Sequence, residues 1–262
     1  MKIINKLVFV IIILTAGCTS TKKLTYLNNL PETGGEDTFI MAIPDYHIQP
    51  RDILYITIKA MTPDGMITDF LSGNRATGST NYMQNESGQY LFGYDVNAEG
   101  NIILPGMGKL NVNGLTLNEA GNKIQELADK YYKNTTIECK LLSFKFTVIG
   151  EVRTPGTFIN YNNYLTVLEA IGRAGGIGDY GRRDRILIVR PTDKGTRTFR
   201  INLHDKKLLS NEAYFLLPND VVIIEPISHK IFNMNLPTFS FIITSITSAI
   251  TTTLLLINYL GK

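Results

Sequence analysis

Leu115-Thr-Leu-Asn-Glu-Ala120 reappears fifty residues later as Leu165-Thr-Val-Leu-Glu-Ala170. In both stretches a threonine is followed three residues later by a glutamate, which is the capping-box pattern of a helix start. The hydroxyl and the carboxylate satisfy backbone amides that the first helical turn leaves free. The first helix is predicted to run to about Tyr132, and the second to end near Gly175 and Gly176. The repeat therefore predicts two helices in equivalent settings.

A predicted hairpin precedes each of these helices. Strand-like residues at 101–104 and 109–112 flank a Pro-Gly turn before the first helix, and residues 145–149 and 157–159 do so before the second. Tyr46 to Ile56 and Tyr214 to Ile224 also match at Tyr, Pro, Asp and the alternating apolar positions. A Pro-x-Asp turn can precede any strand, but two recurring motifs favour a shared architecture. The sequence therefore predicts an α+β fold built from β-grasp-type modules.

No residue pattern in the chain indicates catalysis or a cofactor. Gly176-Ile-Gly-Asp-Tyr-Gly181 matches a dinucleotide-binding pattern, but it follows a helix and precedes a strand at 185–189, the reverse of the order that such a site needs. It is interpreted as a helix C-cap and a loop. His47, His204 and His229 lie singly, without a second metal ligand at the right spacing. The prediction is a protein that is not an enzyme, with no catalytic residue, cofactor or metal.

Two further segments complete the central part of the chain. Residues 61–93 are rich in Gly, Ser, Thr and Asn and are predicted to form a long loop or insertion of unassigned role. Cys139, in an apolar strand-like context, is interpreted as a small core residue. Tyrosines are plentiful, and aromatic faces can stack on sugars, but no sugar site is assigned to them.

The N-terminus carries a secretory signal. Lys2 and Lys6 precede an apolar run, and Thr15-Ala-Gly-Cys18 follows at once. This pattern predicts a lipoprotein signal peptide at 1–17, cleaved to leave Cys18 as the acylated first residue. The alternative is an ordinary signal peptide or a signal anchor with a chance cysteine. Removing Lys2 and Lys6 lowers the formal charge from +3 to +1, which gives no electrostatic case for nucleic acid.

The C-terminus carries a predicted membrane span. Residues 231–261 contain no charge, and the twenty residues from Thr238 to Ile257 would span ~30 Å as a helix. At 100° per residue five hydroxyl side chains fall on one arc, and apolar side chains fall on the opposite side. The hydroxyl arc consists of Ser240, Thr244, Thr247, Ser248 and Thr251. A helical barrel with a wet lumen would need such a stripe, whereas in a single anchor these hydroxyls would bond back to the helix backbone.

Three motifs together resemble the polysaccharide export outer-membrane proteins of the Wza type. They are Tyr46-x-Ile-x-Pro-x-Asp52-x-Leu54, Gly100-x-Ile-x-Leu-Pro-x-x-Gly108 with its continuation to Thr116, and Val148-x-Gly-Glu-Val-x-x-Pro-Gly156. The resemblance covers roughly residues 42–227. It implies an export domain at 42–144 and an SLBB-like β-grasp module with its closing strand at 145–230. A tether at 18–41 and a transmembrane helix at 231–262 flank them.

The resemblance also implies a function. Lipidated protomers would form a periplasmic homo-oligomeric ring, and one helix from each would build a porin-like barrel through the outer membrane of a Gram-negative bacterium. Capsular polysaccharide or exopolysaccharide would pass through it, handed over by an inner-membrane co-polymerase or tyrosine kinase. The five hydroxyl residues would line the lumen. The alternative is a monomeric periplasmic scaffold or glycan-binding lipoprotein anchored at both ends.

Overall fold

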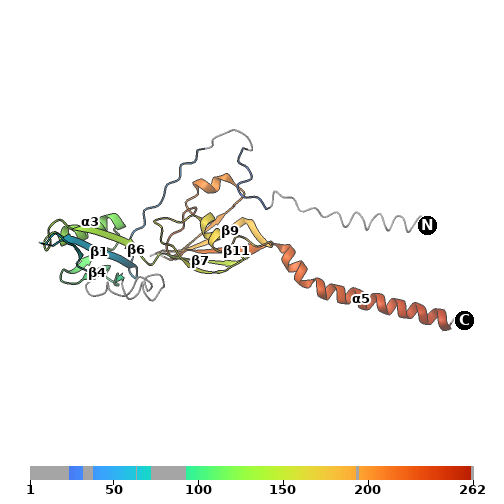
Figure 1. The fold of residues 1–262 in the computed structure, drawn as a ribbon. Helices are drawn as coiled ribbons and strands as arrows, with labels where there is room; N and C mark the ends of the chain where they lie inside the picture. The colour runs from blue at the N-terminus through green and yellow to red at the C-terminus, as the bar shows by residue number, and fades with distance from the viewer. Residues whose placement is uncertain (1–23, 32–37, 63, 72–92, 193–194, 261–262) are drawn as a thin grey trace.

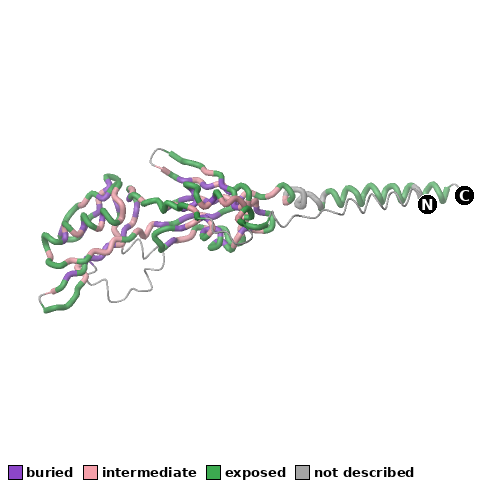
Figure 2. The backbone as a smooth tube through the Cα atoms, turned by 90° about the horizontal axis from the view of Figure 1, so that it is seen from above, coloured by how far each residue is buried: buried purple, intermediate pink, exposed green. Residues whose placement is uncertain are grey.

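The computed structural model describes residues 24–31, 38–62, 64–71, 93–192 and 195–260. Its elements follow one another along an elongated molecule (Figure 1). An N-terminal domain lies at one end, a C-terminal domain in the middle, and the last helix projects from the other end. Buried residues gather in two separate groups, one in each domain (Figure 2).

The N-terminal domain, residues 46–142, is organised around strand β1 (Ile53–Met61). Alternate β1 residues are buried, as the sequence pattern predicts: Leu54, Ile56, Ile58 and Ala60. Strand β6 (Thr136–Leu141) pairs antiparallel with β1 along one edge, and β2 (Ile67–Asp69) and β3 (Tyr94–Asp95) share the other. The hairpin of β4 (Asn101–Leu104) and β5 (Gly108–Asn111) and helix α3 (Leu117–Ala128) complete the core.

The C-terminal domain, residues 144–226, contains a five-stranded sheet in the order β10-β9-β11-β7-β8. Strands β7 and β11 are parallel and the other pairs are antiparallel. Helix α4 (Val167–Arg173) and the 3-10 helix η3 (Lys206–Ser210) accompany the sheet. The strands are β7 (Lys145–Gly150), β8 (Gly156–Ile159), β9 (Gly181–Thr192), β10 (Gly195–Ile201) and β11 (Val221–Pro226).

Both predicted capping boxes are confirmed. Thr116 accepts from the Glu119 amide and Glu119 accepts from the Thr116 amide, and Thr166 and Glu169 do the same before α4. Helix α3 ends at Ala128, earlier than predicted. The Asp129 amide still bonds four residues back, but the amides of Lys130 and Tyr131 bond three residues back in tighter turns. Helix α4 ends at Arg173, close to the predicted end at Gly175 and Gly176, which both have positive φ.

Replacing either capping threonine with alanine should destabilise its domain. Thr116→Ala is expected to cost about 1 kcal/mol. Thr166→Ala should cost more, because the Thr166 side chain also bonds the buried Tyr214 hydroxyl. Urea unfolding monitored by circular dichroism measures both effects, with the exposed strand variant Thr196→Ala as the control. Equal costs for Thr166→Ala and Thr196→Ala would contradict the prediction.

The predicted match between the segments Tyr46–Ile56 and Tyr214–Ile224 is confirmed in their three-dimensional structure. Each proline begins a tight turn whose next residue has positive φ, 77° at Arg51 and 67° at Asn219. The aspartate carboxylate then accepts from the amide before the proline, at 2.9 Å for Asp52 and 2.8 Å for Asp220. The residue after each tyrosine, His47 or Phe215, forms an isolated β-bridge with the capping threonine of the helix in its domain. The two domains therefore hold the segment before the Pro-x-Asp turn against a helix start in the same way.

The segment at 61–93, predicted to be a long loop or insertion, contains regular structure in its first part: Met61 is the last residue of β1 and a short strand follows. Residues 67–69 form β2 and pair with the end of β1. The Asp69 carboxylate stabilises this return of the chain, since it accepts from the amides of Ile58 and Leu71. Residues 72–92 lie outside the described part of the chain.

Candidate functional site

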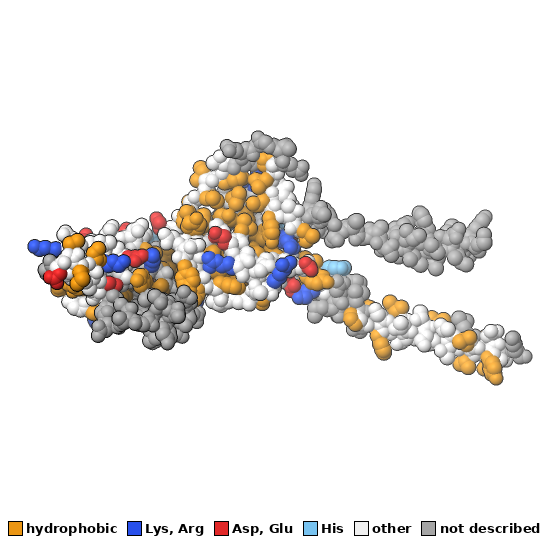
Figure 3. Space-filling model, in the orientation of Figure 1, with side chains coloured by type: hydrophobic (Ala, Val, Ile, Leu, Met, Phe, Trp, Pro, Cys, Tyr) orange, Lys and Arg blue, Asp and Glu red, His pale blue; other side chains and the backbone are white. Residues whose placement is uncertain are grey.

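The C-terminal helix stands apart from both domains. Helix α5 runs from Ser228 to Leu260, and its segment Phe239–Leu260 is 22 residues long with a mean hydropathy of 1.8. None of that segment is buried against the rest of the described chain. Apolar side chains stand out along the projecting helix, with polar ones between them (Figure 3). By length and composition the segment can cross a membrane.

All five hydroxyl residues that the sequence places on one arc lie on α5 and are exposed. Three of them bond the carbonyl four residues earlier: Thr244 at 2.6 Å, Thr247 at 2.8 Å and Thr251 at 2.7 Å. Each hydroxyl hydrogen is thus used within the helix, while the oxygen lone pairs face outwards. Such bonds suit a lone anchor and a lumen alike, so the role of these residues stays a prediction.

The root of α5 is tied to the C-terminal domain. The Ile227 amide donates to the Tyr180 carbonyl at 2.7 Å, and Lys230 forms an ion pair with Glu151. Glu151 follows the last residue of β7, and Tyr180 precedes β9. The direction in which the helix leaves the domain is therefore set by two strand ends of the sheet.

Cys18, the predicted lipidation site, lies outside the described residues. Residues 25–29 of the predicted tether pack on the C-terminal domain. The Leu27 amide donates to the Leu203 carbonyl at 2.8 Å, and the His204 ring bonds the Thr25 carbonyl at 2.7 Å. The chain that follows Cys18 is thus held against the same domain that carries α5.

The two buried carboxylates of the described chain have hydrogen-bond partners inside the protein. Asp220 forms a pair with Arg190, and Asp52 accepts from Tyr46 and Ser143. Burial raises the pKa of the Asp52 carboxyl, and its hydrogen bonds partly oppose this rise. Cys139 is half-buried in β6 instead of fully buried, and burial raises the pKa of its thiol to about 11. It is therefore an unreactive thiol at neutral pH.

No cluster of potential metal ligands occurs among the described residues. His47 bonds the Gly114 carbonyl at 2.9 Å, and His204 bonds Thr25. The glycine-rich 176–181 segment connects α4 to β9, as its interpretation as a helix C-cap and loop requires.

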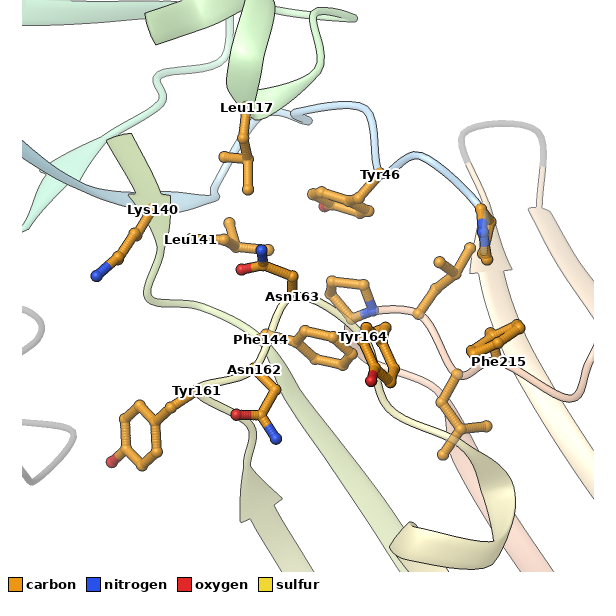
Figure 4. A pocket seen from close by; sticks show the side chains of 14 residues that line it. Tyr46, Leu117, Lys140, Leu141, Phe144, Tyr161, Asn162, Asn163, Tyr164 and Phe215 are labelled. Carbon is orange, nitrogen blue, oxygen red and sulfur yellow. The ribbon is translucent and has the colours of Figure 1, made fainter. Parts of the chain in front are cut away.

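A pocket that no sequence pattern predicts lies at the junction of the two domains. It brings together Tyr46, Tyr161 and Tyr164, which are far apart or unremarkable in the sequence (Figure 4). The first comes from the entry to the N-terminal domain and the others from the loop between β8 and α4. The run Tyr161-Asn-Asn-Tyr164 just before a capping box was the signal available in the sequence.

Comparison with known proteins assigns both domains. Residues 41–142 match the family described as polysaccharide biosynthesis/export protein, and residues 144–224 match the SLBB domain. A relative from Ralstonia solanacearum, the EPS I polysaccharide export outer membrane protein EpsA, is 27% identical over 195 residues, which are 72% of this chain and 50% of the relative.

The protein of the same name from Ralstonia nicotianae is 31% identical over 150 residues, 55% of this chain and 38% of the relative. The matched regions thus span half the length or less of these curated relatives.

Proposed function

Because this chain belongs to the polysaccharide biosynthesis/export family, we propose that it is an outer-membrane subunit of a polysaccharide export translocon. The relatives from both Ralstonia species are named as polysaccharide export outer membrane proteins, which supports the export role and the outer membrane location. The family is described by export and not by a reaction, which supports a role without catalysis.

The observation that carries the proposal is the isolation of α5. None of its 22-residue apolar segment is buried within the described part of the chain, and the length and composition of that segment suit a membrane. One side of α5 carries hydroxyl side chains and the opposite side carries apolar ones, so only the apolar side suits contact with lipid. Copies of α5 arranged in a ring would place the apolar arc against lipid and Ser240, Thr244, Thr247, Ser248 and Thr251 against a wet lumen. The polymer passes through that lumen.

The other parts of the proposal concern the surroundings of the ring. Acylated Cys18 would hold the protomer to the inner leaflet of the outer membrane, with both domains in the periplasm. An inner-membrane co-polymerase or tyrosine kinase would deliver the polysaccharide. The described tether residues support the lipid anchor, since they lie on the domain from which α5 also leaves.

Filling the hydroxyl arc tests the lumen. Thr244→Leu with Ser248→Leu should abolish or strongly reduce surface polysaccharide, because the lumen becomes narrower and apolar, while membrane association persists. Surface polysaccharide is measured by immunoblot or sugar analysis of washed cells. The matched control, Ile242→Leu with Ile246→Leu, changes the apolar arc at constant volume and should leave export normal. Normal surface polysaccharide in the Thr244/Ser248 variant would refute a lumen at this arc.

The mass of the detergent-extracted protein tests the ring. Size-exclusion chromatography with light scattering should give a closed oligomer, visible as rings in negative stain. A monodisperse monomer would favour the second candidate, a monomeric scaffold or glycan-binding lipoprotein. The hydroxyl-to-carbonyl bonds of α5 are compatible with that candidate, because they make a lone helix tolerable in lipid, but they suit a lumen equally.

Replacing residues 239–260 with a generic Leu-Ala anchor separates the two candidates. A scaffold should work with any anchor, so surface polysaccharide would persist. A barrel subunit should lose export while it stays in the membrane.

A further inference from the structure

The loop between β8 and α4, Tyr161-Asn-Asn-Tyr164, is held rigidly from inside the protein. The Asn160 side chain below it is 1% exposed, and its amide donates to the Asn162 carbonyl at 2.7 Å. The Asn160 oxygen accepts from Arg173 at 3.0 Å, and Arg173 also donates to the Ile159 carbonyl at 2.8 Å. A buried polar network therefore fixes this four-residue loop before any ligand arrives.

The outer side of the loop offers aromatic faces and amides together. Tyr161 is 63% exposed and Tyr164 is 46% exposed. The side-chain amides of Asn162 and Asn163 make no hydrogen bond with any described residue, although both side chains could donate and accept. Exposed aromatic rings on a fixed loop supply contact area at a low entropy cost.

Behind the loop lies a small pocket between the domains, with a cavity volume of about 40 Å³. Its wall is largely apolar and comes from both domains. In Figure 4 Asn163 lies between Leu141 and Tyr46, with Tyr164 beside Phe144, while Tyr161 points away from the centre. The pocket has room for one small group and not for a sugar ring.

Charge contributes little to this surface. Lys140, the lysine at the rim, forms an ion pair with Glu138 at 2.6 Å. Because the lysine is neutralised by its neighbour, an acidic ligand gains little from it. A ligand of this surface must bind by stacking and by neutral hydrogen bonds.

We propose that this loop and pocket form a glycan-binding subsite. The C–H faces of pyranose rings carry partial positive charge and stack on the negative faces of tyrosine rings, as cations do. Hydroxyl groups suit the free amides of Asn162 and Asn163, and one exocyclic group, such as a hydroxymethyl or acetamido group, enters the pocket. This inference rests on the proposed export function, and it names a contact with the polymer in the periplasmic body, away from α5.

The test measures binding of full-length protein in detergent to extracellular polysaccharide harvested from the strain that encodes this chain. Isothermal titration with Tyr161→Ala plus Asn163→Ala should show at least about a tenfold loss of affinity. Tyr161→Phe, which keeps the ring face, should retain most of the binding. The control Tyr131→Ala removes a tyrosine of comparable exposure, 55%, from the other domain and should bind as the wild type does. Binding should also change little between low and high salt.

Two results would overturn the subsite. One is wild-type affinity in the Tyr161/Asn163 variant. The other is loss of the oligomer in that variant, measured by light scattering, because the loop would then be a contact between subunits. Deletion of the gene distinguishes failure of the export function. If deletion leaves surface polysaccharide normal, the export function and the subsite fail together; if deletion abolishes it while the variant binds normally, only the subsite fails.

Discussion

Asp220→Ala is expected to lower the free energy of unfolding of the SLBB domain by about 3–5 kcal/mol. Asp220 is fully buried, and its carboxylate accepts from Arg190 Nε at 3.0 Å and from Nη2 at 2.8 Å. The Arg190 side chain is only 7% exposed. Removing the carboxylate leaves a buried cation without its counter-charge, and it also removes the acceptor that closes the Pro218 turn.

Thermal denaturation of the detergent-extracted protein, followed by circular dichroism, measures this effect. For a domain of about 80 residues a loss of this size lowers the melting temperature by more than roughly 10 °C. The matched control is Asp184→Ala. Asp184 also pairs with an arginine, Arg182, but both side chains are substantially exposed, so the loss should stay below about 1 kcal/mol. Similar melting temperatures for the two variants would contradict the assignment of Asp220 to the core.

Gly150→Ala is the second variant with a large expected effect. It should lower the free energy of unfolding by about 3–5 kcal/mol for a steric reason. Gly150 has φ +93°, and a Cβ there would lie 2.1 Å from the carbonyl oxygen of Ile224. Gly150 is the last residue of β7 and pairs with Ile224 of β11, so the obstacle is backbone that cannot turn aside. The change therefore separates the central strands, and it displaces Glu151, which holds Lys230 at the root of α5.

Gly172→Ala is the control of opposite sign. Gly172 lies within α4, and a Cβ there meets nothing within 4 Å. Alanine should therefore stabilise the domain by about 0.5–1 kcal/mol through its helix preference. Urea unfolding of the two variants should shift the midpoint in opposite directions. A midpoint for Gly150→Ala at or above that of the wild type would show that the β7 end is not packed in this way.

Local patterns in the sequence were enough to place both capped helices and the hairpins before them. The capping boxes at Thr116 and Thr166 and the Pro-x-Asp turns involve residues within a few positions of one another, so the pattern itself contains the interacting groups. The uncharged C-terminal span is likewise a matter of composition over one helix. Strand β2 was not predicted, because its three residues are too few to show a strand pattern. It forms because it pairs with β1 and because the Asp69 carboxylate accepts from the Ile58 amide.

The sequence by itself therefore determined the α+β modules, the apolar helix with its hydroxyl arc, and the absence of any recognisable catalytic motif. Tertiary structure alone decided which distant residues meet: Arg190 with Asp220, Glu151 with Lys230, and Tyr46 with the Tyr161 to Tyr164 loop. The physical reason is that periodicity and capping act within a few residues along the chain. A buried ion pair or a pocket depends on the packing of whole sheets, which no local pattern encodes.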